Sequence, residues 1–332
     1  MSVLLTGLDA SLKQRKAQAT ELLSKKLTDG WGKLGKMRRL RVTDRIVLGS
    51  LVTESMMQPG AKGSFNPKSD VIKINARIAE VRPAKIDHLI DEQKRLALEA
   101  TYFAEVEGTN GRDPNNFFLS DHIYEQTIAQ AGVDTLRSVW RGVHNAGGTG
   151  ATDVVNGIVK LIDNDIISDE LPDALVVTHS QSGFFLAESN IIAEFKAMVK
   201  KFRNKLPAYA YTPATLYCGP ERLSEYQFAL EALNGTKMTY NQFDQAVLYF
   251  AKNIVIEPTI DLAGTDFLAI VPDDNFVYLT DRNEDKVSLD SDYNKRDRSI
   301  ALVADWWFAP NYIRADLMVV NDLRVRPAGA EE

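Results

Sequence analysis

Cysteine is nearly absent from this sequence of 332 residues, since Cys218 is the one cysteine in the chain. A single thiol cannot form a disulfide within the chain, which fits a reducing compartment and excludes a cysteine-based structural zinc site. Cys218 ends the apolar run of residues 214–218. We expect it to be a small buried hydrophobic residue rather than a nucleophile.

Long hydrophobic runs are also missing. No apolar run approaches the roughly 18–20 residues that a membrane-spanning helix needs, and the N-terminus has no hydrophobic core of a secretory signal. Hydrophobic residues make up 45% of the chain, so it can bury one or two cores of roughly 100–200 residues each. We therefore expect a soluble protein that is made in the cytoplasm.

The spacings typical of metal ligands do not occur. The acidic clusters at residues 163–165 and 281–285 resemble calcium ligands only loosely, and the second lacks the glycine and distal glutamate of an EF-hand loop. We interpret both clusters as solvated turns. The histidines show no close metal-ligand spacing, such as two histidines separated by three residues. The four histidines are His88, His122, His144 and His179.

Two short motifs invite a functional interpretation, but each misses a required feature. Residues 147–150 (Gly-Gly-Thr-Gly) lack the Lys-Ser/Thr ending and the preceding strand of a phosphate loop, so we expect them to end a helix. His179 and Ser180 are neighbours on an extended segment, where their side chains point to opposite faces, and no Gly-x-Ser-x-Gly motif is present. The sequence thus predicts no catalytic, cofactor-binding or metal-binding residue, and no enzymatic activity.

Charge is unevenly distributed along the chain. The formal net charge is −6, but residues 1–45 carry eleven Lys and Arg against four Asp and Glu, or +7, which leaves −13 on the remainder. Ala19, Leu23, Leu27 and Trp31 recur every fourth residue, which predicts a helix with one apolar face. We favour an amphipathic helix that packs on the body or on a neighbour. Contact with nucleic-acid phosphates and a helix on a membrane surface are the alternatives.

An extended region follows the basic segment. Residues 58–70 are rich in Pro, Gly and Asn, and from Ile72 to Ile78 apolar and polar residues alternate, which predicts a strand with one wet face. Pro83 interrupts the pattern, and residues 86–90 form a second strand or a turn into a helix. Two strands alone bury too little apolar surface to be stable. The ribbon needs support, and a neighbouring subunit is the natural candidate.

Helices dominate the next part of the chain. We predict a helix over residues 91–105, a loop at residues 108–114, and a long helix from an N-cap at Ser120 to residues 147–148. The long helix has an apolar stripe formed by Tyr124, Ile128, Ala131, Leu136, Val139, Trp140 and Val143.

The remaining segments predict a mixture of strands and helices. A strand at residues 174–177, a helix near residues 191–205, a strand at residues 214–218 and a helix at residues 220–233 form a mixed α+β layer rather than a repeating βαβ ladder. A doubly wound enzyme is therefore disfavoured. Apolar runs between residues 253 and 320, separated by turn-forming segments such as residues 272–275 (Pro-Asp-Asp-Asn), predict that a sheet is completed at the end of the chain.

This order of elements resembles the HK97-type fold of tailed-bacteriophage major capsid proteins. Residues 85–91 are similar to the distal part of the extended loop in such proteins, and the strand–Gly-Pro–helix at residues 216–233 is similar to their axial-domain strand and helix. Residues 271–281, followed by residues 299–320, resemble their closing segment and last peripheral strand. The resemblance covers nearly the whole chain and is carried by pattern rather than by an invariant motif.

The resemblance implies an α+β fold with four parts. They are an N-terminal arm (1–50), an extended β-ribbon or E-loop (51–91), a peripheral domain with a spine helix (92–172 and 299–332), and an axial domain (173–298). The arm would lie along neighbouring subunits, and the ribbon would overlap an adjacent one. The arm is short for a scaffolding segment, which implies a separate scaffolding protein or none. A Lys–Asn crosslink cannot be placed from Lys62, Lys68 or Lys73 alone.

The same resemblance implies a function and partners. The chain would be a major capsid protein, without catalytic residues or cofactors, that self-assembles through hexamers and pentamers into the icosahedral shell around the double-stranded DNA of a tailed phage. Portal, scaffolding or decoration proteins and non-specific contact with DNA are implied, but no membrane. The protein would be located in the virion after assembly in the bacterial host cytoplasm. An encapsulin-like compartment and an α+β nucleic-acid-associated enzyme are the alternatives.

Overall fold

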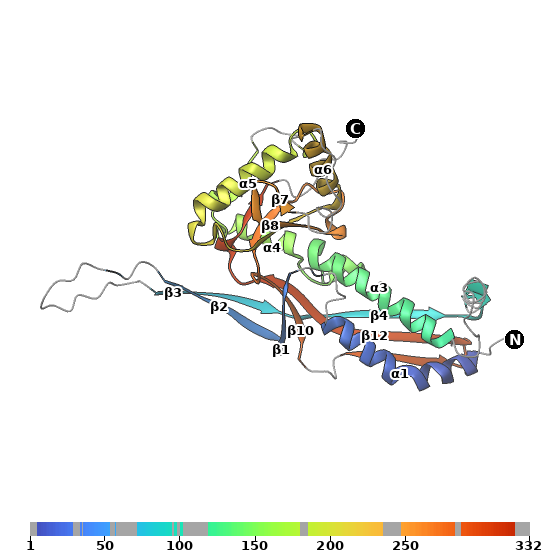
Figure 1. Cartoon of the computed structure of the whole chain (residues 1–332). Helices are drawn as coiled ribbons and strands as arrows, with labels where there is room; N and C mark the ends of the chain where they lie inside the picture. The colour runs from blue at the N-terminus through green and yellow to red at the C-terminus, as the bar shows by residue number, and fades with distance from the viewer. Residues whose placement is uncertain are drawn as a thin grey trace, which may run out of the picture.

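The structure is a computed structural model with three distinguishable parts: a long sheet crossed by two helices, a smaller sheet flanked by helices, and a hairpin that projects away from both (Figure 1). The described residues are 5–28, 34, 36–53, 57, 72–94, 96–97, 100–101, 119–179, 185–234, 247–282 and 287–322. Within these ranges, no helix combines the length and the hydrophobicity that crossing a bilayer would require.

The long sheet, which we call the platform sheet, is built around the 14-residue strand β12. Ile300, Leu302, Trp306 and Phe308 are buried and alternate with half-buried residues, as expected for a strand with one covered face. β11 and β4 flank its first part, and β10 pairs with its last part and carries β1 at the edge. The strands are β1 (Arg38–Val42), β4 (Arg82–Ile90), β10 (Phe276–Asp281), β11 (Ser288–Asn294) and β12 (Ser299–Tyr312).

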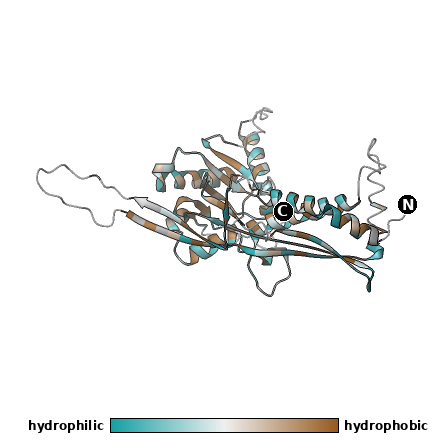
Figure 2. Ribbon diagram, turned by 90° about the horizontal axis from the view of Figure 1, so that it is seen from below, coloured by the Kyte–Doolittle hydropathy of each residue, from teal (hydrophilic) through white to brown (hydrophobic). Residues whose placement is uncertain are grey.

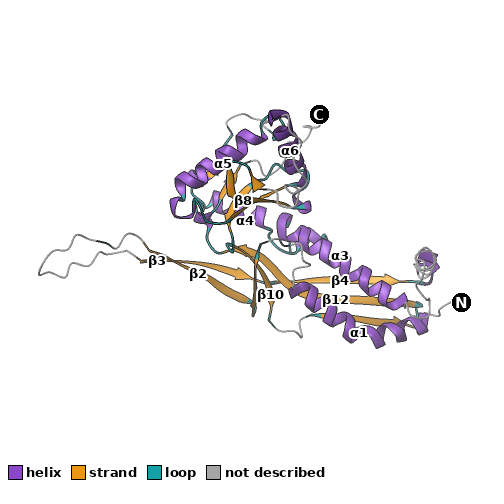
Figure 3. Cartoon of the chain, in the orientation of Figure 1, coloured by secondary structure: helices purple, strands orange, loops and turns teal. Residues whose placement is uncertain are grey.

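Two long helices, α1 (Leu5–Thr28) and α3 (Leu119–Arg141), lie along the platform sheet (Figures 1 and 3). The apolar face of α1 is buried at Leu8, Leu12, Ala19 and Leu23, which confirms an amphipathic helix packed on the body; Trp31 lies outside the described residues. The stripe predicted for the long helix is confirmed, because its members from Tyr124 to Trp140 are buried.

The ends of α3 differ from the prediction. The helix begins at Leu119, and it ends at Arg141 rather than at residues 147–148, which leaves Val143 outside it and 51% exposed. The reason is a close approach of two glycines: the N–H of Gly157 donates to the carbonyl of Gly142 over 2.8 Å. A Cβ atom on Gly142 would lie 2.4 Å from a backbone oxygen, so this crossing requires glycine and turns the chain before residue 147.

The second sheet, which we call the small sheet, has the strand order β5-β13-β9-β6-β8-β7. It mixes parallel pairs (β5 with β13, β6 with β8) and antiparallel pairs, which confirms a mixed α+β layer. The helices α4 (Ile158–Ile167), α5 (Ile191–Lys205) and α6 (Pro220–Asn234) accompany it. Its strands are β5 (Val176–Val177), β6 (Ala214–Cys218), β7 (Val247–Leu248), β8 (Ala251–Pro258), β9 (Ala269–Pro272) and β13 (Val319–Asn321).

β6 is the central strand of the small sheet, and all five of its residues are buried. Cys218 at its end is fully buried, and burial raises the pKa of its thiol to about 12. A thiol in this state is not a nucleophile, so the predicted role of Cys218 as a small buried residue is confirmed.

The projecting hairpin consists of β2 (Arg45–Thr53) and β3 (Ile72–Glu80), paired antiparallel from Arg45 opposite Glu80 to Thr53 opposite Ile72. β1 and β2 are joined through Asp44, whose φ of 55° lies in the left-handed region that Asp tolerates better than most residues. The chain therefore turns directly from the edge of the platform sheet into the hairpin.

This hairpin differs from the predicted ribbon. Its first strand begins at Arg45, before the predicted boundary at residue 51, and residues 82–90 form β4 of the platform sheet instead of pairing with residues 72–78. Pro83 does not break β4, because among the described strands β4 pairs with β12 alone and an edge strand tolerates proline. β3 and β4 are separated only by Val81.

The last third of the chain contributes strands to both sheets rather than completing one sheet. β10 and β11, which the prediction placed in the axial domain (173–298), belong to the platform sheet, whereas β13, predicted to be peripheral, belongs to the small sheet. A turn at Asp274, with φ 68°, redirects the chain from β9 in the small sheet to β10 in the platform sheet. The pattern of apolar residues in a strand indicates its burial but not which sheet receives it, so sheet membership differs from the predicted division of the chain.

Candidate assembly surfaces

The hairpin exposes an apolar face. Val47 and Ile78 are paired in the hairpin and lie on the same face, together with Ile72 and Ile74 further along β3. Their exposed fractions are 60%, 69%, 55% and 73%, respectively. We call these four residues the apolar hairpin face. Figure 2 shows the hydrophobic colour continuing onto the projecting strands, away from the body.

The opposite face of the hairpin is anchored at its base. Leu48 and Ala79 are buried against Val277, Leu279 and Ala309 of the platform sheet. The two faces therefore differ in what covers them: one packs on the chain's own body, and the other faces solvent. The predicted need of the ribbon for additional support is met only on one side.

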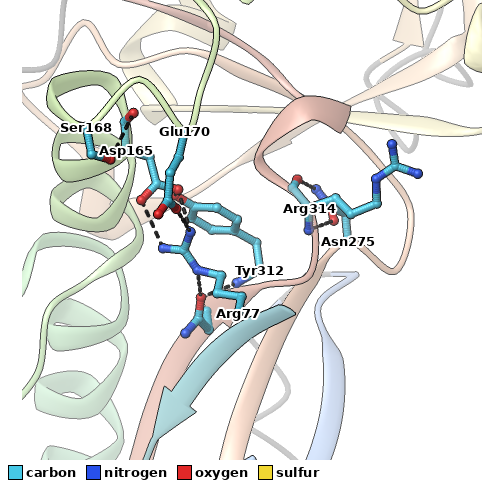
Figure 4. Close-up of polar contacts among 8 residues, drawn as sticks. Arg77, Asp165, Ser168, Glu170, Asn275, Tyr312 and Arg314 are labelled. Atoms are coloured by element: carbon cyan, nitrogen blue, oxygen red, sulfur yellow. Dashed lines mark hydrogen bonds and ion pairs between the residues drawn. The ribbon is translucent and has the colours of Figure 1, made fainter. Parts of the chain in front are cut away.

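Arg77 of β3 makes the polar contacts at this base (Figure 4). Its guanidinium donates to Asp165 on α4 over 2.5 and 3.2 Å, to the Asn311 side chain over 2.7 Å and to Glu170 over 3.3 Å. It also lies over the ring of Tyr312, with 4.2 Å from Cζ to the ring centroid, and the Tyr312 hydroxyl donates to Asp165. We call these five residues the hairpin junction.

Charge and burial are balanced within the hairpin junction. Asp165 is only 4% exposed, and its carboxylate is neutralised by the guanidinium. Burial disfavours the charged form of Arg77, but its bonds with Asp165 outweigh this effect, so the pKa of Arg77 is raised above its usual value. The interpretation of residues 163–165 as a solvated turn was therefore wrong for Asp165. An open cavity of about 910 Å³ lies beside the hairpin junction.

The N-terminal helix is docked on its own chain. Lys16 pairs with Asp290 over 2.6 Å, the Tyr124 hydroxyl donates to the Leu12 carbonyl over 2.9 Å, and the hydroxyls of Ser11 and Ser120 are 2.7 Å apart. The resemblance implies an arm along neighbouring subunits, and the structure shows that residues 5–28 are docked on their own chain. An apolar face that fits the chain's own sheet and spine helix is buried there first.

The basic character of the segment is exposed elsewhere. β1 forms an edge of the platform sheet, and Arg38, Arg39 and Arg41 on it are exposed. Lys36 just before it pairs with Asp273 over 3.3 Å. The exposed cations of the first 45 residues thus include a short row of arginines on a sheet edge, which we call the arginine edge.

His179 lies in a polar cluster at the end of the small sheet. Its ring is 2.5 Å from Asp322 through Nδ1 and 3.1 Å from Glu194 through Nε2, and Ser180 lies outside the described residues. Burial opposes the charged ring, but the bonds to Asp322 and Glu194 outweigh it and raise the pKa of His179. The cluster connects the end of β13 with α5. Sequence reasoning missed Asp322 and Glu194, since one of them is 143 residues away from His179.

The other candidates from the sequence do not gather into a site. The ring of His144 contacts Arg82 and the carbonyls of residues 153 and 154, His122 is buried on α3, and His88 is exposed on β4. In the part of the chain that the structure describes, no group of three His, Cys, Asp or Glu side chains is placed to hold a metal ion.

The remaining two sequence motifs have ordinary surroundings. In the Gly-Gly-Thr-Gly segment, the N–H of Gly150 donates to Asp153 over 2.8 Å, so the chain's own carboxylate occupies that donor. Asp281 is 8% exposed at the end of β10, so the interpretation of a solvated turn was wrong there, and residues 283–285 lie outside the described residues.

No model of a protein family matches this sequence, and no curated protein matches it either. Several solved structures do match the fold of this chain. A chain of the satellite phage P4 procapsid, determined with the size determination (Sid) protein, matches with a TM-score of 0.62 and 13% identity over 92% of this chain and 90% of that chain. A chain of Mycobacterium phage Adephagia matches with a TM-score of 0.52 and 12% identity over 87% of this chain and 89% of that chain.

A third match is the holo-SrpI encapsulin complex from Synechococcus elongatus, with a TM-score of 0.50 and 10% identity over 93% of this chain and 91% of that chain. At such identities a likeness shows the fold. The chain therefore has the HK97-type fold, and the resemblance to tailed-phage capsid proteins found in the sequence is confirmed at that level.

Proposed function

We propose that this chain is the major capsid protein of a tailed phage and assembles into the icosahedral head shell around double-stranded DNA. The observation that carries the proposal is the apolar hairpin face, exposed on a fold that aligns with the P4 procapsid chain over 92% of this chain. A fold alone does not define a function. The exposed hairpin supplies the further argument, because the apolar hairpin face on every copy needs a partner surface that covers it.

A second copy of this chain is the partner that the hairpin fits. Two strands bury too little surface to be stable alone, and exposed isoleucines and valines are stabilised when another surface covers them. A contact between the hairpin of one copy and the body of the next is heterologous, and such contacts close into rings. Rings of six and five copies then combine into a closed shell.

The parts of the fold receive roles under this proposal. The hairpin is the extended loop that overlaps a neighbour, the platform sheet with α1 and α3 is the peripheral domain, and the small sheet with α5 and α6 is the axial domain around the five- and six-fold axes. The domain boundaries then follow sheet membership: residues 276–312 are peripheral, and residues 319–321 join the axial part.

Charge supports an arrangement around DNA. The chain beyond residue 45 carries −13, so most of its surface repels phosphate and leaves a packaged genome free to move. The arginine edge is the exposed feature suited to non-specific phosphate contact. Portal, scaffolding or decoration proteins complete the set of partners, and the protein is located in the virion after assembly in the host cytoplasm. The role is structural rather than enzymatic.

An encapsulin-like compartment is the second candidate, because the same fold occurs in the Synechococcus encapsulin match. The phage shell is preferred, since the P4 match has the higher TM-score, 0.62 against 0.50. Genes for a portal and a terminase beside the coding sequence would support the phage shell. A neighbouring cargo-enzyme gene in their place would support the compartment.

Assembly of the purified chain tests the proposal. We expect rings or closed particles in negative-stain micrographs and a sedimentation coefficient far above that of a monomer. The double variant Val47→Asp/Ile78→Asp places charges on the apolar hairpin face and should leave folded, unassembled subunits. The matched variant Val47→Leu/Ile78→Val keeps the face apolar and should assemble. A monomeric wild-type chain, or full assembly of the aspartate variant, contradicts the proposal.

A further inference from the structure

The hairpin and the platform sheet are connected at two places, by the turn at Asp44 between β1 and β2 and by Val81 between β3 and β4. β3 and β4 follow each other with only Val81 between them, but β3 pairs with β2 of the hairpin and β4 pairs with β12 of the platform sheet. The two connections lie side by side, because the N–H of Val81 donates to the carbonyl of Asp44 over 3.0 Å. The direction of the hairpin relative to the body therefore depends on the contacts that lie just beyond Val81.

Those contacts are of two kinds. Leu48 and Ala79 pack against Ala309 and its neighbours, and apolar contacts of this kind are not directional. Arg77 is different, because its planar guanidinium meets both oxygens of Asp165 and lies over the Tyr312 ring. Bidentate and stacked contacts fix an angle as well as a distance.

The hairpin junction also joins three parts of the fold at one carboxylate (Figure 4). Asp165 lies near the end of α4, and it receives bonds from Arg77 of the hairpin and from Tyr312 of the platform sheet. The segment after α4 leads to Leu171, whose N–H donates to the Asp165 carbonyl over 3.0 Å, and then to β5 of the small sheet. A change at this carboxylate would thus alter contacts of the hairpin, of the platform sheet and of the segment that leads to the small sheet.

We propose that Arg77 and Asp165 are positioning residues that set the angle of the hairpin in each subunit, and through it the curvature of the assembled shell. The second half of this statement rests on the proposed function. The first half concerns one chain and stands without it.

The length of the hairpin makes the angle important. β3 has nine residues, which at about 3.3 Å per residue form a lever of roughly 30 Å. A rotation of about 10° about Val81, at the base of this lever, would move its far end by about 5 Å. A displacement of that size is enough to mismatch the apolar hairpin face with a neighbour, or to seat it at a different angle between subunits.

A distance measurement on the full chain tests the angle. Spin labels on cysteines introduced at Ile72, at the far end of β3, and at the exposed Lys200 of α5 report the distance between hairpin and body. The buried Cys218 stays unlabelled. Labelled protein diluted into an excess of unlabelled protein gives distances within one chain.

The informative variant is Arg77→Met/Asp165→Asn, which removes both charges together. Removing Arg77 alone would leave a buried carboxylate without its partner and could unfold the site, whereas removing the pair leaves no buried charge. The matched control is Arg45→Met. Arg45 also lies on the hairpin, but it pairs with Glu80 over 3.3 Å in the same hairpin.

For the double variant we expect a native-like circular dichroism spectrum, a broadened distance distribution and a mean shifted by about 5 Å. Arg45→Met should give the wild-type distribution. A wild-type distribution in the double variant overturns the proposal, and so does equal broadening in Arg45→Met. Assembly is assayed separately: the double variant should form particles of mixed size, and uniform particles of wild-type size contradict the link to curvature. If the wild-type chain does not assemble, the proposed function fails, while the distances still decide the role of Arg77 and Asp165.

Discussion

β6 and β3 are both apolar strands, yet their surroundings are opposite. All five residues of β6 are buried between β8 and β9, whereas Ile72, Ile74 and Ile78 of β3 are 55%, 73% and 69% exposed. The two strands follow the same local rules of composition and alternation. An apolar strand therefore indicates that a covering surface exists, but not whether the same chain provides it.

The helix α1 shows that a segment at the end of the chain can bury its apolar face on its own chain, without another copy. It precedes the hairpin in the chain and resembles a free arm in sequence, but its apolar face is buried on the platform sheet and α3. By contrast, the buried side chains among the described residues of the hairpin are Leu48 and Ala79, near its base. The chain thus combines one projecting segment whose apolar face is covered by its own body with one whose apolar face is exposed.

The largest expected effect compares the two strands directly. Leu216→Ala in β6 removes a fully buried side chain and should lower the free energy of unfolding by about 2–5 kcal/mol. Ile74→Ala in β3 removes a side chain that is already in water, and the change should be less than about 0.5 kcal/mol. Urea titrations of unassembled subunits measure both values.

Equal losses of stability in these two variants would break the comparison. They would mean that the apolar hairpin face is covered within the single chain, and the argument for assembly through it would lose its basis. The same titrations on assembled particles should show a larger loss for Ile74→Ala, because its surface is then buried by a neighbour.

The comparison also explains how much the sequence could predict. The stripe from Tyr124 to Trp140 and the run at residues 214–218 predicted a helix and a buried strand, because burial within one element follows its own period. The order of such elements was enough for the α+β class and for the HK97-type resemblance. The partners of the strands were not predictable, since the apolar residues of 82–90 and 276–281 predict burial whichever sheet receives them.

The hairpin junction was beyond prediction for a different reason. Arg77 and Asp165 are 88 residues apart, and the sequence around each is typical of a charged residue on the surface. Asp165 stands in an acidic segment that favours a solvated turn, but contacts with Arg77 and Tyr312, distant in the sequence, bury it. Ion pairs of this kind depend on tertiary distance, which a single sequence does not contain.

A smaller effect is expected at His179, a titratable residue beside the small sheet. Asp322 and Glu194 face the ring, and Lys201 lies close to Asp322. Since the folded pKa of His179 is raised above its ordinary value of 6.5, its contribution is fully present below pH 6.5 and is lost as the pH rises through the folded pKa.

His179→Gln should therefore lower the free energy of unfolding by about 1 kcal/mol at pH 5.5, and by less at alkaline pH. Urea titrations of both proteins at a series of pH values measure this difference. A difference that is constant with pH, or that grows as the pH rises, would show that the charged ring does not hold β13 and α5 together.

The smallest effect is expected at Lys16, and it sharpens the contrast between α1 and the hairpin. Burial opposes ionisation of Asp290, but the Lys16 ammonium outweighs it and lowers the pKa of this carboxyl, so the pair is fully formed above the ordinary value of 3.8 and is lost as the pH falls through the lowered one. Both side chains are about half exposed, at 44% and 52%, so solvent screens the pair. Lys16→Ala should cost about 0.2–0.5 kcal/mol at neutral pH and nothing measurable in high salt.

Leu12→Ala, which removes a fully buried side chain of the same helix, should cost about 2–5 kcal/mol. If the two variants lose equal stability, charge rather than apolar contact holds α1 to its own chain. An acidic surface on a neighbouring copy could then displace α1 from its own body, just as an apolar surface on a neighbour is proposed to cover the hairpin.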